Sequence, residues 1–396
     1  MKAWRAAGRA AAAAVVALAL NQNARAAEPV DIDVVMALTG GAAFVGQAGQ
    51  KTLQIAETIV NKDGGIKGRP VHFVFHDDET SPQVAVQITN QIIAKHPPVF
   101  LGAMLVGQCK AMAPLLQQAG PTMYCFSPAM SAKPGEFAFA SFLPTTGIAQ
   151  AVLHYFHSKG WARLGAITTT DASGQDSESA FDEVLKKPEF AGMSIVDREH
   201  FNAQDVSVVA QIERLRGAKP DALIAYTTGA AVGTIFRGLT QTGFDVPVAT
   251  STGNVLYTIM KQFASVVPKQ LYFAAGAGSA SGEGLHLKPG MIAQKKIVDA
   301  ALKEIGAKPD FGTEVVWDAA MITIDALRHV GADASPAAVQ NYILSLKSYE
   351  GLTGTYDFTK YPMSGLGSEN ALVVRWNAAQ ESFEAMSQPG GEPIAR

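Results

Sequence analysis

The chain has 396 residues, of which 48% are hydrophobic and 17% charged, and its formal net charge is −3. This balance excludes an intrinsically disordered chain and is sufficient for two domains with apolar cores. After the N-terminal segment, no apolar run is long enough to span a bilayer, so a polytopic membrane protein is not expected.

Residues 1–26 have the pattern of a secretory signal peptide. A basic head is followed by the apolar run Ala10–Leu20 and by the small-residue cleavage site Ala24-Arg25-Ala26. We expect cleavage near Ala26 and release into the periplasm. Cleavage removes Lys2, Arg5, Arg9 and Arg25 and makes the chain more acidic, which argues against nucleic acid and anionic membrane as partners.

Short β-branched runs alternate with longer helix-period segments along the rest of the chain, and this predicts an α/β fold with parallel sheets. The helix after Ser81 has a clear start, with Ser81 as N-cap and Pro82 in the first helical position. Strands are predicted at Val30–Ala37, Val71–His76, Pro98–Leu101, Thr122–Phe126, Arg163–Thr168, Ser194–Phe201, Asp221–Tyr226, Val246–Ser251 and Gln270–Ala274.

The strand count exceeds what one compact parallel sheet usually holds, so we expect two lobes. Pro and Gly interrupt the pattern at residues 142–147, where we place a lobe boundary. A Gly-rich stretch at residues 274–282 predicts a second crossing between the lobes. It resembles a dinucleotide-binding glycine pattern only loosely, and no cofactor is expected.

The two cysteines, Cys109 and Cys125, lie in the exported part of the chain, where oxidation is permitted. If they occupy neighbouring strand-to-helix connections, one disulfide is possible. Two buried free thiols are the alternative, and the sequence leaves both open.

Signatures of catalysis are absent: the sequence contains no nucleophile elbow, phosphate-binding loop or zinc-protease helix. His72 and His76 precede an acidic run, but a strand end followed by the Ser81 cap explains them better than a metal site does. His154 and His157 are assigned to the edge of an amphipathic helix. We therefore expect neither metal nor enzymatic activity.

The loops after the predicted strands are rich in Ser, Thr, Gly, Asn and Gln and poor in charge. In a parallel α/β sheet these loops line a crevice at the carboxyl ends of the strands. Their composition favours a small neutral or singly anionic ligand. The loops are residues 105–109, 127–131, 169–175, 227–229 and 252–254.

A series of motifs resembles the leucine/isoleucine/valine-binding protein family, the periplasmic binding subunits of ABC importers. It begins with Asn61-Lys62-Asp63-Gly64-Gly65-Ile66-Lys67-Gly68-Arg69-Pro70 and a strand ending in Asp77-Asp78. It continues through Ala113-Pro114-Leu115, Ser127-Pro128-Ala129, Gly160-Trp161, Lys219-Pro220-Asp221-Ala222, Trp317-Asp318-Ala319 and Gly351-Leu352-Thr353-Gly354-Thr355-Tyr356-Asp357-Phe358. The resemblance covers nearly the whole mature chain.

The resemblance implies a type I periplasmic binding fold, with two doubly wound lobes joined by a three-crossing hinge that closes over a solute. The third crossing falls near Gly351–Gly354. It implies an N-terminal lobe of residues 27–144 plus 277–350 and a C-terminal lobe of residues 145–276 plus 351–390. The expected partners are a small-molecule ligand and the permease subunits of an ABC transporter, and the chain is expected to be a monomer.

Carried over by position, the family's carboxylate-binding loop falls on Val106, Gly107 and Gln108, followed by Ala129 and Ser131. The second lobe contributes Ser173 and Thr227, and the family's ammonium-binding acidic residue falls at Gly253 or Asn254. Because no carboxylate is found there and an unpaired buried ammonium is costly, we expect an aromatic or aliphatic carboxylate rather than a free amino acid. The residues expected around its apolar body are Phe44, Val45, Met130, Tyr226 and Tyr257.

Two alternatives remain at this point. A ligand-sensing module for a membrane receptor would have the same fold and a different partner. An exported α/β hydrolase is less favoured, because no nucleophile and base pair can be named.

Overall fold

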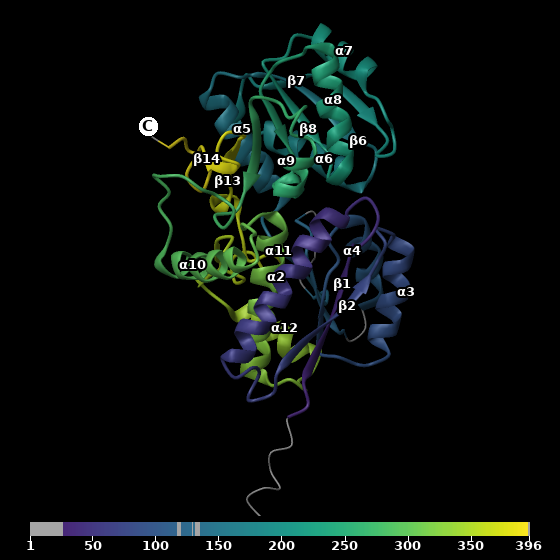
Figure 1. Ribbon diagram of the computed structural model, residues 1–396, viewed down its shortest axis with the longest axis vertical. Helices are drawn as coiled ribbons and strands as arrows, with labels where there is room; N and C mark the ends of the chain where they lie inside the picture. The colour runs from purple at the N-terminus through teal and green to yellow at the C-terminus, as the bar shows by residue number, and fades with distance from the viewer. Residues whose placement is uncertain (1–26, 117–119, 129, 131–134, 395–396) are drawn as a thin grey trace, which may run out of the picture.

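The computed structural model describes residues 27–116, 120–128, 130 and 135–394. Two lobes lie one above the other along the long axis, as Figure 1 shows. The predicted signal peptide lies outside the described residues, so its cleavage stays a prediction.

The first lobe is built on a five-stranded parallel sheet in the order β2-β1-β3-β4-β5. Its strands are β1 (Val30–Met36), β2 (Val71–Asp77), β3 (Val99–Leu101), β4 (Thr122–Cys125) and β5 (Ala138–Ala140). The helices between them are α2 (Ala43–Lys62), α3 (Pro82–Ile93), α4 (Val106–Met112) and the short 3₁₀ helix η1 (Ala113–Leu116).

The second lobe is built on a seven-stranded sheet in the order β14-β13-β10-β9-β8-β6-β7, in which β13 and β14 are the antiparallel members. Its strands are β6 (Arg163–Thr169), β7 (Ser194–Phe201), β8 (Ala222–Tyr226), β9 (Val248–Thr250), β10 (Leu271–Ala275), β13 (Leu372–Asn377) and β14 (Ser382–Ala385). Its helices are α5 (Thr145–Ser158), α6 (Ala172–Leu185), η2 (Pro188–Phe190), α7 (Val209–Gly217), η3 (Gly229–Ala231), α8 (Val232–Thr242), η4 (Thr252–Asn254) and α9 (Tyr257–Gln262).

The remaining elements follow β10 in the chain. They are α10 (Pro289–Glu304), α11 (Phe311–Val330), α12 (Pro336–Ser345), the small antiparallel pair β11 (Tyr349–Glu350) and β12 (Thr355–Tyr356), and η5 (Ser368–Asn370). Helix α11 packs on α2, and α12 packs against β4. The predicted residue boundaries of the two lobes stay predictions.

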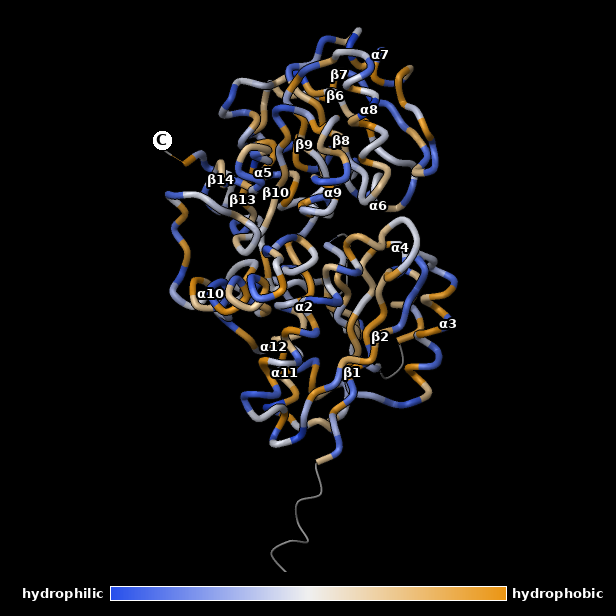
Figure 2. The backbone as a smooth tube through the Cα atoms, in the orientation of Figure 1, coloured by the Kyte–Doolittle hydropathy of each residue, from blue (hydrophilic) through white to orange (hydrophobic). Residues whose placement is uncertain are grey.

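Each of the nine predicted strands is present, and most are continuous apolar runs that are buried on both faces of a parallel sheet. Strand β8, for example, is buried at every position. Figure 2 shows such hydrophobic segments inside both lobes and hydrophilic segments along the outer helices and loops. Helix α3 also begins as predicted. The Val84 amide donates to Ser81 Oγ at 3.4 Å, and Pro82 lies in the first turn of the helix.

Cys109 of α4 and Cys125 of β4 form a disulfide, with their Cα atoms 6.0 Å apart. Both residues are completely buried in a small apolar cluster between the sheet and α3. Of the two readings that the sequence leaves open, the structure therefore contains the bonded one.

The first turns of α11 hold the segments that connect the two sheets. Glu314 accepts hydrogen bonds from the Ser279 amide (2.9 Å) and hydroxyl (3.2 Å). Asp318 accepts from the amides of Leu352 (2.6 Å) and Thr353 (2.8 Å). The two segments also bond each other directly, because the Ala277 amide donates to the Thr353 carbonyl at 3.1 Å.

These buried carboxyls predict an unusual dependence of stability on pH. Burial raises the pKa of Glu314 to about 8 and that of Asp310 to about 7. Between pH ~4.5, where these groups titrate in the unfolded chain, and pH ~8, the folded state binds more protons than the unfolded state does. The free energy of unfolding should therefore fall as pH rises through this window. Carboxyls whose pKa is lowered in the folded state, such as that of Asp33, act in the opposite sense only below pH ~4.

Urea unfolding at about pH 5 and pH 8 tests this expectation. The protein should be more stable at the lower pH, and Glu314→Gln should reduce the difference because the amide does not titrate. A free energy of unfolding that rises from pH 5 to pH 8 would contradict it.

Candidate functional site

A small cavity lies between the lobes, at the carboxyl ends of the strands of both sheets, with a volume of about 50 Å³. Its first wall comes from strand-end loops of the first lobe and from α11: Met104, Leu105, Val106, Ser127, Pro128 and Phe311. The opposite wall comes from the second lobe: Thr145, Ile148, Ser173, Asp176, Ser177, Tyr226, Thr228, Ser251, Thr252 and Gly253. A wider hollow of about 600 Å³ adjoins it and shares Leu105, Ser173 and Thr228.

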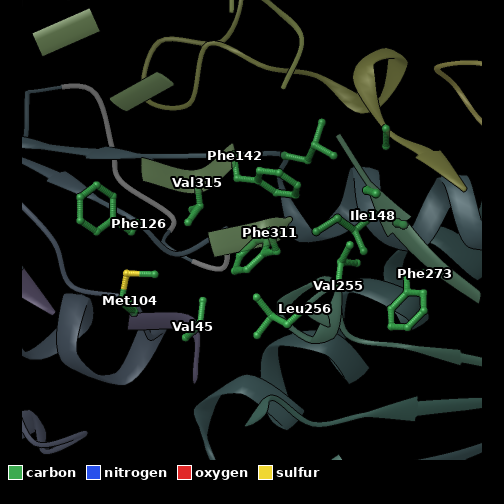
Figure 3. Packing of buried hydrophobic residues seen from close by; sticks show 14 of the residues in the cluster. Val45, Met104, Phe126, Phe142, Ile148, Val255, Leu256, Phe273, Phe311 and Val315 are labelled. Atoms are coloured by element: carbon green, nitrogen blue, oxygen red, sulfur yellow. The ribbon is translucent and has the colours of Figure 1, made fainter. Parts of the chain in front are cut away.

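The lobes touch around this cavity. The Phe311 amide donates to the Val255 carbonyl at 2.9 Å, and Figure 3 shows Phe311 lying near Val255, Leu256 and Ile148. At the mouth, Gly229 of the second lobe (φ +82°) faces Gly41 of the first so closely that a Cβ there would lie 2.6 Å from the Gly41 carbonyl oxygen. The arrangement is therefore a closed one, and a side chain at Gly229 would obstruct it.

Several polar atoms on the second-lobe wall lack a hydrogen-bond partner within the described residues. They are the hydroxyls of Tyr226, Thr252 and Thr145 and the Oδ2 atom of Asp176. Tyr226 and Thr252 are 3% and 2% exposed, so their hydroxyls face the cavity rather than bulk solvent. Buried polar groups are nearly always hydrogen-bonded, and an unsatisfied group in a cavity indicates a place for a bound molecule.

Tyr226 is fixed by its surroundings. It ends the buried strand β8, and its ring packs edge-on against Phe181 of α6 with the centroids 5.3 Å apart. Burial raises the pKa of its hydroxyl, which therefore stays protonated and able to donate a hydrogen bond.

Asp176 is one of the cavity residues that sequence reasoning missed. It lies in the first turns of α6, whose N-cap is Asp171, and it lines the cavity. Burial raises the pKa of its carboxyl, while the Thr145 hydroxyl and the Lys110 ammonium act in the opposite direction. Sequence reasoning sought a carboxylate at Gly253 or Asn254 and found none, whereas the structure places one on the cavity wall at Asp176. The helical spacing from Ser173 to Asp176 puts both on one face of α6 and could have revealed it.

The residues predicted for the site fall into three groups. Val106, Ser173 and Tyr226 line the cavity itself. Gly107 and Gln108 line the adjoining hollow, and Met130 lines a further hollow on the other side. Ala129 and Ser131 lie outside the described residues.

The other predicted residues do not line the cavity. Val45 and the partly buried Phe44 pack in the core on α2. Asn254 joins two loops, because its Oδ1 accepts from the Gly229 amide (2.9 Å) and its Nδ2 donates to the Thr227 carbonyl (2.7 Å). Tyr257 packs against Trp376 and Phe383. Ligand-binding roles for these residues stay predictions.

The histidines considered as metal ligands bond to single carboxylates. His72 contacts Asp31 at 3.2 Å, and His76 contacts Asp33 at 2.7 Å, where Lys95 also binds. Within the described residues, no group of three or more histidine, cysteine and acidic side chains is placed to hold a metal ion. The glycines at 276 and 278 pack closely on the Glu314 side chain.

Comparison with known proteins agrees with this architecture. The family described as "Periplasmic binding protein" matches residues 29–381. A Leu/Ile/Val-binding protein homolog 3 of Brucella melitensis is 22% identical over 354 residues, which cover 88% of this chain and 91% of the relative.

Two solved structures share the fold over nearly their whole length. One is the branched-chain amino acid transporter substrate binding protein LivJ from Streptococcus pneumoniae in complex with isoleucine (TM-score 0.76, 19% identity, 90% of this chain and 99% of that one). The other is a fatty acid ABC transporter substrate-binding protein from Thermomonospora curvata (TM-score 0.74, 16% identity, 92% and 90%).

The two sheets, with a cavity between the lobes built on them, give this protein the two-lobed architecture of type I periplasmic binding proteins. The chain belongs to the periplasmic binding protein family. Within the described part of the chain, no helix has the length and apolar character needed to cross a membrane.

Proposed function

We propose that this protein is a periplasmic solute-binding subunit that captures a small organic molecule between its lobes and delivers it to the permease of an ABC importer. The observation that carries the proposal is the cavity enclosed by both lobes, with unpartnered hydroxyls and a carboxyl on one wall. Binding without chemical change is part of the proposal, since the cavity wall holds no nucleophile with a base in hydrogen-bond reach among the contacts described.

The hinge supports lobe movement. The connecting segments at residues 277–279 and 351–353 lie side by side and are held by α11. Such an arrangement allows rigid lobes to rotate about short connections as ligand enters and leaves.

A thermal-shift screen tests the proposal. Exported protein is unfolded and refolded to remove any bound solute, then heated with amino acids, organic acids, amides and urea. A ligand present at about 100 times its dissociation constant should raise the free energy of unfolding by roughly 2.7 kcal/mol. Recovery of that ligand unchanged is expected, whereas turnover of it would contradict the proposal.

A blocking variant locates the binding. Ser173→Trp fills the cavity from a half-buried position on α6, and it should abolish the ligand-induced shift while leaving the unliganded protein folded. Gln175→Trp, on the exposed side of the same helix, is the matched control and should bind normally. Binding that survives Ser173→Trp would place the ligand elsewhere.

A further inference from the structure

Two short segments of the first lobe, each following a strand of its sheet, form one wall of the cavity. Met104, Leu105 and Val106 follow β3 and lead into α4, whereas Ser127 and Pro128 follow β4. Helix α4 also contacts α6, which supplies part of the opposite wall. The position of these two segments therefore sets both the shape of the cavity and one contact between the lobes.

The segment after β3 is attached to β4 at both of its ends. At its start, the Phe126 amide donates to the Ala103 carbonyl at 3.0 Å. At its end, the disulfide joins Cys109 of α4 to Cys125, the last residue of β4. The wall residues 104–106 lie between these two attachments, so loss of the disulfide would leave the segment anchored to β4 at its start only.

Helix α4 depends on this bond because its own means of holding its place are weak. It has seven residues, and a helix this short gains little stability from its own hydrogen bonds. Its N-cap is Leu105, whose side chain cannot accept a hydrogen bond from the first amides. The other wall segment meets the same bond, since the Ser127 amide donates to Cys125 Sγ at 3.3 Å.

We propose, resting on the binding function proposed above, that the Cys109–Cys125 disulfide is a positioning element of the ligand site. It holds residues 104–106 and the Ser127 amide in the arrangement that closes on the ligand, so ligand affinity depends on the bond in addition to stability. Without the bond, the wall segment spends part of its time in other positions. A site that is in its binding arrangement for about a tenth of the time binds about 10-fold more weakly.

Isothermal titration with leucine, propionate and propionamide tests the proposal, because these compounds present an amino-acid, an acid and an amide head. It compares oxidised wild type, wild type in dithiothreitol, and the double variant Cys109→Ala with Cys125→Ala, all refolded from urea. Dithiothreitol gives two electrons and two protons to the bond, which yields two thiols and the cyclic disulfide of the reagent. For each compound that oxidised wild type binds, the other two forms should bind roughly 10-fold more weakly. Reoxidation of the reduced protein with oxidised glutathione should restore the affinity.

Leu215→Ala is the control for lost stability. Leu215 is completely buried on α7, which lies at the end of the second lobe away from the first in Figure 1, and its truncation also lowers the free energy of unfolding. This variant should keep wild-type affinity at a temperature where circular dichroism shows every form folded. An equal loss of affinity in Leu215→Ala would assign the effect to stability and overturn the proposal. Wild-type affinity in the reduced protein and in the double variant would overturn it as well.

Hydrogen exchange of the ligand-free protein tests the positioning independently of any ligand. The amides of residues 104–110 and of Ser127 should exchange faster without the bond, whereas those of β8 in the second lobe should not change. Unchanged exchange at residues 104–110 would overturn the proposal whatever the titration shows. Faster exchange there, in a protein that binds no compound of this panel or of the wider screen, would contradict the binding function and not the positioning of the wall.

Discussion

Asp318→Ala is expected to lower the free energy of unfolding by about 3 kcal/mol. Asp318 is 1% exposed and accepts hydrogen bonds from the Leu352 and Thr353 amides and from the Tyr356 hydroxyl at 2.9 Å. Removing the carboxyl leaves these buried donors without a partner, at a cost of about 1–3 kcal/mol each. Part of that cost is offset, because the variant no longer has to bury a carboxyl away from water. Urea unfolding followed by circular dichroism measures the change.

The control for Asp318→Ala is Asp299→Ala on α10, which removes a partly exposed ion pair with Lys295. Its effect should stay within about 1 kcal/mol. If both variants cost the same, the network around α11 does not stabilise the hinge segments as described. A smaller loss in Asp318→Asn than in Asp318→Ala would agree with hydrogen bonding as the cause.

Loss of the Cys109–Cys125 disulfide should lower the free energy of unfolding by about 3 kcal/mol. The bond joins residues that are 16 positions apart in the sequence. A cross-link that closes a loop of this length lowers the conformational entropy of the unfolded chain, which stabilises the folded state by about 3 kcal/mol. The double variant Cys109→Ala with Cys125→Ala, compared with wild type with and without reductant, measures the effect. Identical urea midpoints for oxidised and reduced wild type would contradict the expectation.

Most of the main strands were predictable because they are short buried runs whose apolar character continues on both faces, as in β1 and β8. Strand β5 (Ala138–Ala140) escaped prediction because its three residues, Ala-Phe-Ala, include no β-branched side chain. Strands β13 and β14 were also missed. They pair antiparallel beyond β10, and nothing local in the sequence signals that a distant C-terminal segment returns to that sheet.

The site was predictable in outline and not in detail. Strand-end loops do form the cavity, as the rule for parallel sheets implies. Asn254 was assigned to the ligand, but its amide can satisfy both an N–H and a carbonyl of its own loops and does so. Asp176 was overlooked because it directly follows the predicted loop and lies inside α6, although its helical spacing from Ser173 places both residues on one face of the helix.

The central claim is that a solute is held between the two lobes. A crystal structure of the exported protein with the ligand that stabilises it most tests this claim directly. We expect ligand density enclosed by both lobes, within hydrogen-bond distance of Asp176, Tyr226 and Thr252. Ligand density on an outer surface, with the space between the lobes filled by water alone, would contradict it.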